Sequence, residues 1–200
     1  MQAKMNLRKF NEAIVIIDKL IELEPSNIEW PLFKSHIQIY NGDIELARYG
    51  FEGVLSRDPF SVEAYHGLIM VGAQSGSAEL DAIIKRIESK IDKCKKERMK
   101  DVARDLILLI AQIRVIEGKY TDALKVYQDL VKEEPKDFRP YLCQGIIYTL
   151  LRKKDEADKQ FQKYKRLVPK GHPYTGYFDD NMIATQLFAQ KVENEKMGRS

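Results

Sequence analysis

An internal period of 34 residues is the feature that most constrains what this chain can fold into. Alanines and prolines recur at this period, and each alanine stands 12 residues before its proline: Ala13 and Pro25, Ala47 and Pro59, Ala123 and Pro135, Ala157 and Pro169. The step from Ala47 to Ala123 is 8 residues longer than two periods, which predicts one further unit with degenerate markers and an insertion. Periods of this length are typical of solenoids, in which each unit buries its apolar face against its neighbours.

Each unit of the repeat has the pattern of two helices joined by a short turn. Apolar residues recur at three- and four-residue steps over 104–117 and again over 120–131. Gly118 lies between these segments and can adopt the left-handed conformation that ends a helix, as can Gly42 and Gly76 in other units. A proline then stops the second helix because it lacks the amide donor that a helix interior needs. The chain is therefore expected to be all-helical.

Composition favours helices and argues against several other classes. The 200 residues include only 11 glycines and 7 prolines, too few for a turn-rich sandwich or barrel. The net charge of +3 is too small to indicate nucleic-acid binding. No apolar run approaches the roughly 20 residues of a membrane span. Cys94 and Cys143 stand in no close-spaced motif, so we expect single thiols rather than a disulfide or a zinc site.

These features resemble the tetratricopeptide repeat, a helix–turn–helix unit with the pattern W-x2-L-G-x2-Y, A-x3-F and P. The best match to this pattern is made by Tyr141, Gln144, Gly145, Tyr148, Ala157, Phe161 and Pro169. Weaker matches begin at Trp30 and Ile107. The resemblance implies a right-handed superhelical solenoid of about four repeats over residues 1–170. The first repeat would be incomplete, and the third degenerate with an insertion around 85–100.

A closer resemblance links the chain to a plant chloroplast group, the SLOW GREEN and chloroplast lumen common family proteins. It rests on the segments 48–60, 62–70, 113–120, 130–158 and 168–191. The resemblance implies a plastid protein that is needed for chloroplast development, acts through protein contacts and lacks catalytic chemistry. It leaves the stroma, the thylakoid and the lumen open as locations. Such proteins carry an N-terminal transit region, which this chain lacks, so a mature or truncated form is expected.

Residues 171–200 are predicted to form an aromatic loop and a C-terminal capping helix. Asp179 or Asp180 can cap the N-terminus of that helix. Its apolar side chains form one stripe of Met182, Ile183, Leu187, Phe188 and Val192. A terminal repeat exposes an apolar face that needs such a cover. The alternative is a helix that lies in the concave groove of the solenoid and blocks partner binding.

The candidate partner-binding residues stand at the positions of each first helix that face the concave groove. Counting along the repeats gives His36, His66, Met70, Leu108, Gln112, Arg139, Leu142 and Ile146. This groove is largely apolar with a few polar points, which suits an amphipathic helix or an extended apolar segment of a plastid protein. Only Arg139 resembles a member of the carboxylate clamp with which many tetratricopeptide domains hold chaperone tails. The oligomeric state stays open.

No pattern in the sequence indicates an enzyme, a metal site or a cofactor. His36, His66 and His172 each lack a second ligand at metal-binding spacing. The chain contains no phosphate-binding glycine motif and no nucleophile elbow. We therefore interpret the first two histidines as polar lining of the groove. The expected function is that of a non-catalytic scaffold or assembly factor.

The segment 85–100 is rich in cations, which raises an alternative function. Its basic residues include Lys90, Lys93, Lys95, Lys96, Arg98 and Lys100. A basic patch can attract phosphate groups, and the alternative is an RNA-binding helical-repeat protein of the plastid. Acidic residues are interleaved at Glu88, Asp92, Glu97 and Asp101, which favours a longer, solvated helical hairpin instead. The apolar groove positions also argue against RNA readout.

Overall fold

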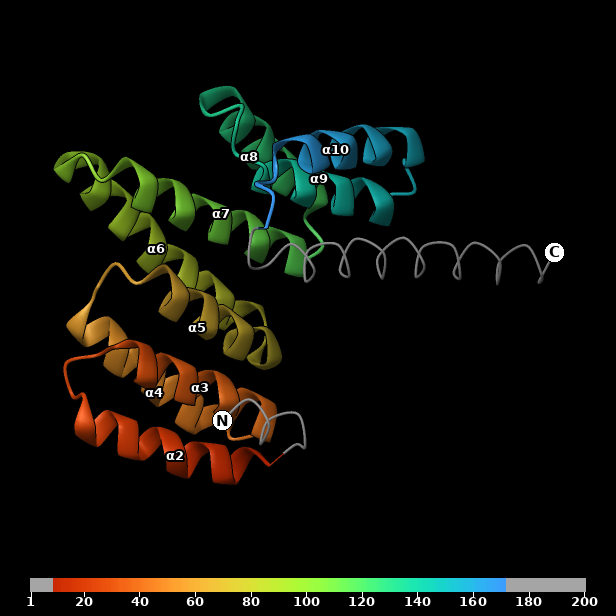
Figure 1. Cartoon of the computed structure of the whole chain (residues 1–200). Helices are drawn as coiled ribbons and strands as arrows, with labels where there is room; N and C mark the ends of the chain where they lie inside the picture. Colours follow the sequence, from red (N-terminus) through yellow and green to blue (C-terminus); the bar gives the residue numbers. More distant parts are fainter. Residues whose placement is uncertain (1–8, 172–200) are drawn as a thin grey trace, which may run out of the picture. The chain divides into compact units, whose positions relative to one another are not determined.

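The computed structural model describes residues 9–171, and this part of the chain consists of α-helices and turns, without a strand. In chain order the helices are α2 (Phe10–Leu23), α3 (Glu29–Asn41), α4 (Ile44–Arg57), α5 (Val62–Ser75), α6 (Ser77–Glu97), α7 (Lys100–Ile116), α8 (Tyr120–Glu133), α9 (Arg139–Leu150) and α10 (Lys154–Leu167) (Figure 1). The prediction of an all-α fold is confirmed. The predicted C-terminal helix lies outside the described residues. Whether it caps the last repeat or lies in the concave groove therefore stays a prediction.

The periodic prolines each lie two residues beyond the end of a helix. Helices α2, α4, α8 and α10 are followed in this way by Pro25, Pro59, Pro135 and Pro169. In all four cases the residue just after the helix still donates its backbone N–H to the carbonyl four positions earlier, at 2.8–3.0 Å. The proline that follows has no N–H to extend this series, so the helix ends there.

The periodic alanines are buried where helices meet. Ala13, Ala47 and Ala123 have no exposed surface, and Ala157 is 3% exposed. A methyl side chain lets two helix backbones approach closely without leaving a void. The repeat phase read from the sequence therefore places these alanines at buried positions of the fold.

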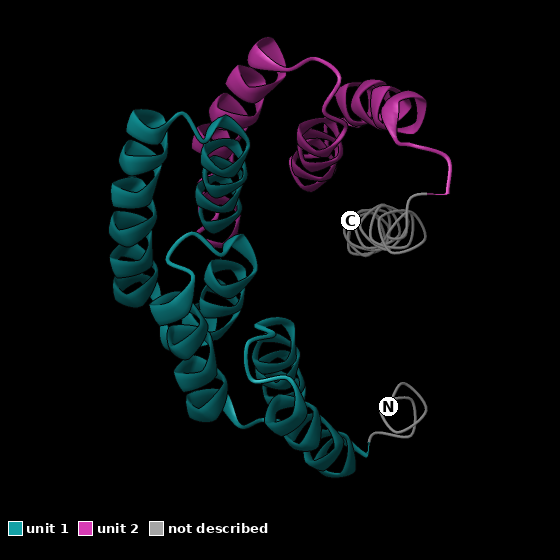
Figure 2. Ribbon diagram, turned by 60° about the vertical axis from the view of Figure 1, so that its left-hand side comes forward, with its two compact units in different colours: residues 1–113 teal, residues 114–200 magenta. Residues whose placement is uncertain are grey.

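The described chain falls within two compact units, residues 1–113 and 114–200 (Figure 2). In the first unit, each of α2 to α5 packs against the next helix along the chain, and α3 also contacts α5. A large core joins α4, α5, α6 and α7 through side chains such as Phe51, Leu68, Ile87 and Leu106. A smaller core joins α2 to α3 around Ile17 and Ile37.

The second unit has a core of its own. Helix α8 packs on α9, and α9 on α10. Tyr141, Phe161 and Tyr164 lie at the centre of this core, and the rings of Phe138 and Tyr164 are 6.0 Å apart.

The two longest described helices, α6 and α7, include most of the segment 85–100. Helix α6 has 21 residues and α7 has 17, whereas the other described helices have 12 to 14. Helix α6 buries one apolar face along its length, from Leu80 to Cys94. Most of its lysines lie on the opposite, exposed face.

Candidate functional site

Three of the polar residues predicted to line the groove lie on three different helices of the first unit. His36 lies on α3, His66 on α5 and Gln112 on α7. The Nε2 atoms of Gln112 and His66 are 3.2 Å apart. The His36 ring contacts the Phe51 ring edge-on, with centroids 5.0 Å apart. The polar positions that the sequence predicted on α5 and α7 are therefore brought into direct contact.

Two apolar groove residues accompany these polar ones. Met70 follows His66 by four residues on α5, and Gln112 follows Leu108 by four residues on α7. Residues four apart share one face of a helix, so each helix presents a polar and an apolar side chain together. All are partly exposed, and Met70 and Leu108 lie outside the large core of the first unit. We call His36, His66, Met70, Leu108 and Gln112 the α3–α5–α7 strip.

The strip carries no charge at neutral pH. Burial lowers the pKa of His36, and the neighbouring His66 lowers it further. Burial also lowers the pKa of His66, against the opposing effect of Glu63. Both rings are therefore neutral near pH 7. The Gln112 amide nitrogen can only donate, so the His66 Nε2 accepts this hydrogen bond, which the neutral ring allows.

The groove positions predicted in the second unit have other contacts. The Arg139 backbone N and side-chain Nε both donate to Asp137 Oδ1 at 3.0 Å, and its Nη2 donates to Asp137 Oδ2 at 3.0 Å. Leu142 is only 7% exposed, and Ile146 packs against the same core. Arg139 is therefore held by its own turn, and the two apolar side chains help to close the α9–α10 core.

Sequence reasoning missed the contacts between the basic helix α6 and two aromatic rings. The Nζ atoms of Lys90 and Lys93 lie 5.9 and 5.4 Å from the centroid of the Phe60 ring. The Arg86 guanidinium carbon lies 5.8 Å from the centroid of the Tyr65 ring. The only sequence signal was the position of Phe60 directly after a periodic proline, which places it in the turn between α4 and α5.

The described residues offer few groups for other chemistry. No cluster of three His, Cys, Asp or Glu side chains among them could hold a metal ion. None of their helices is long and apolar enough to cross a bilayer. Cys94 and Cys143 are free thiols. Burial raises the pKa of Cys94, and it raises the pKa of Cys143 to about 11. Neither is therefore a reactive thiolate at neutral pH.

The helix arrangement matches that of solved tetratricopeptide proteins. The crystal structure of TTC0263, a thermophilic TPR protein of Thermus thermophilus, matches with a TM-score of 0.63 and 14% identity, over 92% of this chain and 93% of that one. The crystal structure of MamA matches with a TM-score of 0.50 and 22% identity, over 82% of this chain and 91% of that one. At such identities the likeness is one of fold. The described helices therefore have the fold of tetratricopeptide repeat proteins.

In sequence, the chain is similar to SLOW GREEN 1, a chloroplastic protein of Arabidopsis thaliana. The two are 37% identical over 194 residues, which cover 97% of this chain and 61% of the relative. This finding confirms the resemblance to the SLOW GREEN group. No family model matches the chain.

Proposed function

We propose that this chain is a non-catalytic protein-binding scaffold of the chloroplast. Its α3–α5–α7 strip would hold a helical or extended apolar segment of a protein partner. The tetratricopeptide fold supports binding of a protein, because this fold exposes the first helices of successive repeats for partner contacts. The similarity to a chloroplastic relative supports the location. On the same resemblance we extend the proposal to a role in chloroplast development, as a scaffold or assembly factor.

The observation that carries this proposal is the combination of side chains in the strip. Its centre is the neutral His66–Gln112 pair, in which the two side chains hydrogen-bond to each other at 3.2 Å. Met70 and Leu108 stand four residues from His66 and Gln112 on the same helices, so they share a helix face with them, and both are partly exposed. A surface of this kind can bury apolar side chains of a partner and offer hydrogen bonds to its backbone. It has no charge that would select a carboxylate or a phosphate.

The same chemistry weighs against the rival function of RNA binding at this strip. Proteins that hold RNA need cations for the phosphates and open aromatic faces for the bases. The strip has neutral histidines, and the basic side chains of the first unit are concentrated on α6. We therefore favour a protein ligand, and ribonuclease treatment during affinity capture separates the two functions.

The test is affinity capture from chloroplast extract with three forms of the chain. The first form is the wild type, and the second is M70E/L108E, which places two carboxylates in the strip. The third form, L46E/Y49E, makes the same chemical change on α4, where Leu46 is 58% and Tyr49 is 81% exposed. Each form is first checked for helical content and thermal unfolding, and each capture is repeated after ribonuclease treatment.

We expect a protein to be captured by the wild type and by L46E/Y49E and to be lost with M70E/L108E. Ribonuclease should not change this pattern. Equal capture by all three folded forms would refute the strip as the binding site. Loss of capture after ribonuclease treatment would support the RNA-binding function instead. Should M70E/L108E fail to fold, H66A provides the same comparison with a smaller change.

A further inference from the structure

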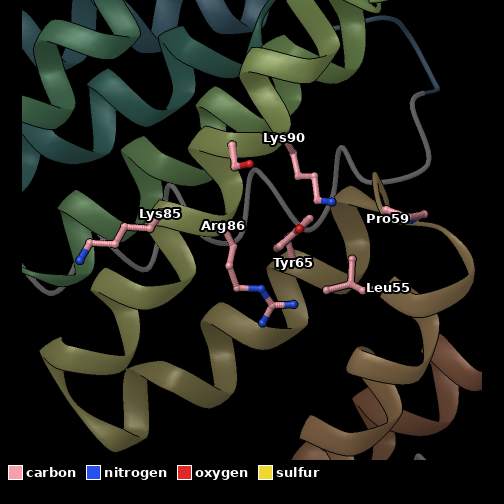
Figure 3. Close-up of a pocket in the computed structure, with 7 residues that line it drawn as sticks. Leu55, Pro59, Tyr65, Lys85, Arg86 and Lys90 are labelled. Atoms are coloured by element: carbon pink, nitrogen blue, oxygen red, sulfur yellow. The ribbon is translucent and has the colours of Figure 1, made fainter.

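An open pocket of about 400 Å³ lies in the first unit, apart from the α3–α5–α7 strip (Figure 3). One wall comes from the end of α4 and the turn after it, with Leu55 and Pro59, and the opposite wall comes from α6. Tyr65 of α5 lies between them. The strip contributes no residue to this pocket, so the two sites can be tested separately.

The α6 wall of the pocket is positively charged. Lys85, Arg86 and Lys90 line it together with Ser89. The positive charge of Arg86 is balanced by Glu52, because its two terminal nitrogens donate hydrogen bonds to the two carboxylate oxygens of Glu52 at 2.6 and 2.8 Å. Neither lysine has an ion-pair partner within the described chain. Lys90 therefore brings an uncompensated positive charge to the pocket, and Lys85 adds a second one at its outer edge.

The side chains in the pocket leave an unequal distribution of polar and apolar surface. Figure 3 shows the Lys90 ammonium on the side of Pro59 and the Lys85 ammonium extending away from the opposite edge, with Arg86 and Tyr65 between them. Leu55 and Pro59 add apolar surface beside Lys90. A ligand that fits this pattern combines negative charge with an apolar group next to it.

The aromatic rings around the pocket already carry cations on their faces. Arg86 lies over Tyr65, and Lys90 and Lys93 lie over Phe60. Single-stranded nucleic acids bind by stacking their bases on open aromatic rings. Here a nucleobase would first have to displace one of these cations from the ring face. This favours a carboxylate-bearing peptide over a nucleotide or RNA.

We propose that this pocket is a second binding site, for an acidic segment of a protein in which glutamate or aspartate alternates with an aliphatic residue. A carboxylate of the segment pairs with Lys90, and a second carboxylate, outside the pocket, pairs with the Lys85 ammonium that extends from the opposite edge. Ser89 can donate a further hydrogen bond, and the aliphatic side chain packs on Leu55 and Pro59. The proposal does not depend on the function assigned to the α3–α5–α7 strip.

The test is the binding of a labelled short peptide of alternating glutamate and leucine, followed by fluorescence anisotropy. A second peptide with glutamine in place of glutamate removes the charge. The pocket variant is K85Q/K90Q, and the matched control is K95Q/K96Q, which removes the same charge from an exposed part of α6 outside the pocket. Inorganic phosphate and a single-stranded RNA oligonucleotide serve as competitors.

We expect the acidic peptide to bind, with an affinity that falls as salt is added. K85Q/K90Q should weaken binding by about tenfold or more, and K95Q/K96Q by less than about twofold. Equal losses in the two variants would overturn the proposal, because they would indicate an unspecific response to net charge. So would equal binding of the uncharged peptide, or no binding at peptide concentrations on the order of 1 mM. Phosphate or RNA that binds more tightly than the peptide would replace the proposed ligand.

Discussion

At the scale of single residues, two glycines show how closely the helices of this fold approach one another. A Cβ atom at Gly67 would lie 2.3 Å from two atoms of the Phe51 ring, and one at Gly145 would lie 2.4 Å from the Phe161 ring. Both rings are buried, so they cannot move aside freely. The glycine at position 145 was part of the repeat pattern read from the sequence. The close approach of Gly67 to the Phe51 ring of the preceding helix is visible only in the structure.

Replacing either glycine by alanine should therefore destabilise the protein. We expect G67A and G145A each to lower the free energy of unfolding by about 1–3 kcal/mol, the usual cost of overpacking a well-filled core. The matched control is G53A on α4, where a Cβ atom would have no neighbour within 4 Å. G53A should instead stabilise the protein by about 0.5–1 kcal/mol, since alanine is the better helix former. Urea unfolding measures all three, and a stable G145A would contradict the ring contact.

The two strip histidines make stability depend on pH in a defined window. Their pKa values are lowered in the folded protein, whereas in the unfolded chain a histidine has a pKa of about 6.5. As the pH falls below that value, the unfolded state takes up protons first, so the free energy of unfolding decreases. The decrease ends below the folded-state pKa values. Carboxylates titrate at about pH 4 and contribute little in this window.

We therefore expect the wild type to lose stability between pH 7 and pH 5.5, and H36Q/H66Q to lose distinctly less. Chemical unfolding at several pH values gives both slopes. An identical slope for the two proteins would show that these histidines are not held neutral by the fold.

At the scale of helices and turns, arginines occupy two positions where a glycine would be expected. Gly42 and Gly118 end α3 and α7 with positive φ angles of 88° and 74°, as the sequence predicted. Arg98 after α6 and Arg152 after α9 have φ angles of 61° and 60°. Arginine rarely adopts a positive φ angle, so the sequence gives no sign that the chain turns in this way at Arg98 and Arg152.

Arg98 should therefore be a position where glycine stabilises the protein. The left-handed conformation costs an ordinary residue roughly 1–2 kcal/mol, and glycine avoids this cost at a smaller loss in the unfolded chain. We expect R98G to raise the free energy of unfolding by about 0.5–1 kcal/mol. K96G, inside the last turn of α6, should lower it by about 1 kcal/mol. Thermal unfolding of the two variants checks this, and a destabilised R98G would point to a structural role for the arginine side chain.

At the scale of the whole molecule, the sequence predicted the fold well because the repeat uses the same contacts many times. Each periodic alanine and proline has one structural role, so four copies of the pattern reinforce one another. The groove itself stays a prediction, and the contacts of its predicted residues could be foreseen only in part. Position counting located His66 and Gln112, but it could not foresee that Asp137 holds Arg139 or that Leu142 is buried. Such outcomes depend on which neighbouring side chains are present, and the repeat pattern does not specify these.

The central claim is that a protein partner binds along the α3–α5–α7 strip. The most direct measurement is photo-crosslinking in chloroplast extract with p-benzoyl-phenylalanine placed at Met70, and in a second protein at Tyr49, an exposed aromatic position on α4. We expect the probe at Met70 to form a covalent adduct with a plastid protein and the probe at Tyr49 to form none. An adduct from Tyr49 alone, or an adduct with RNA at Met70, would contradict the proposed function.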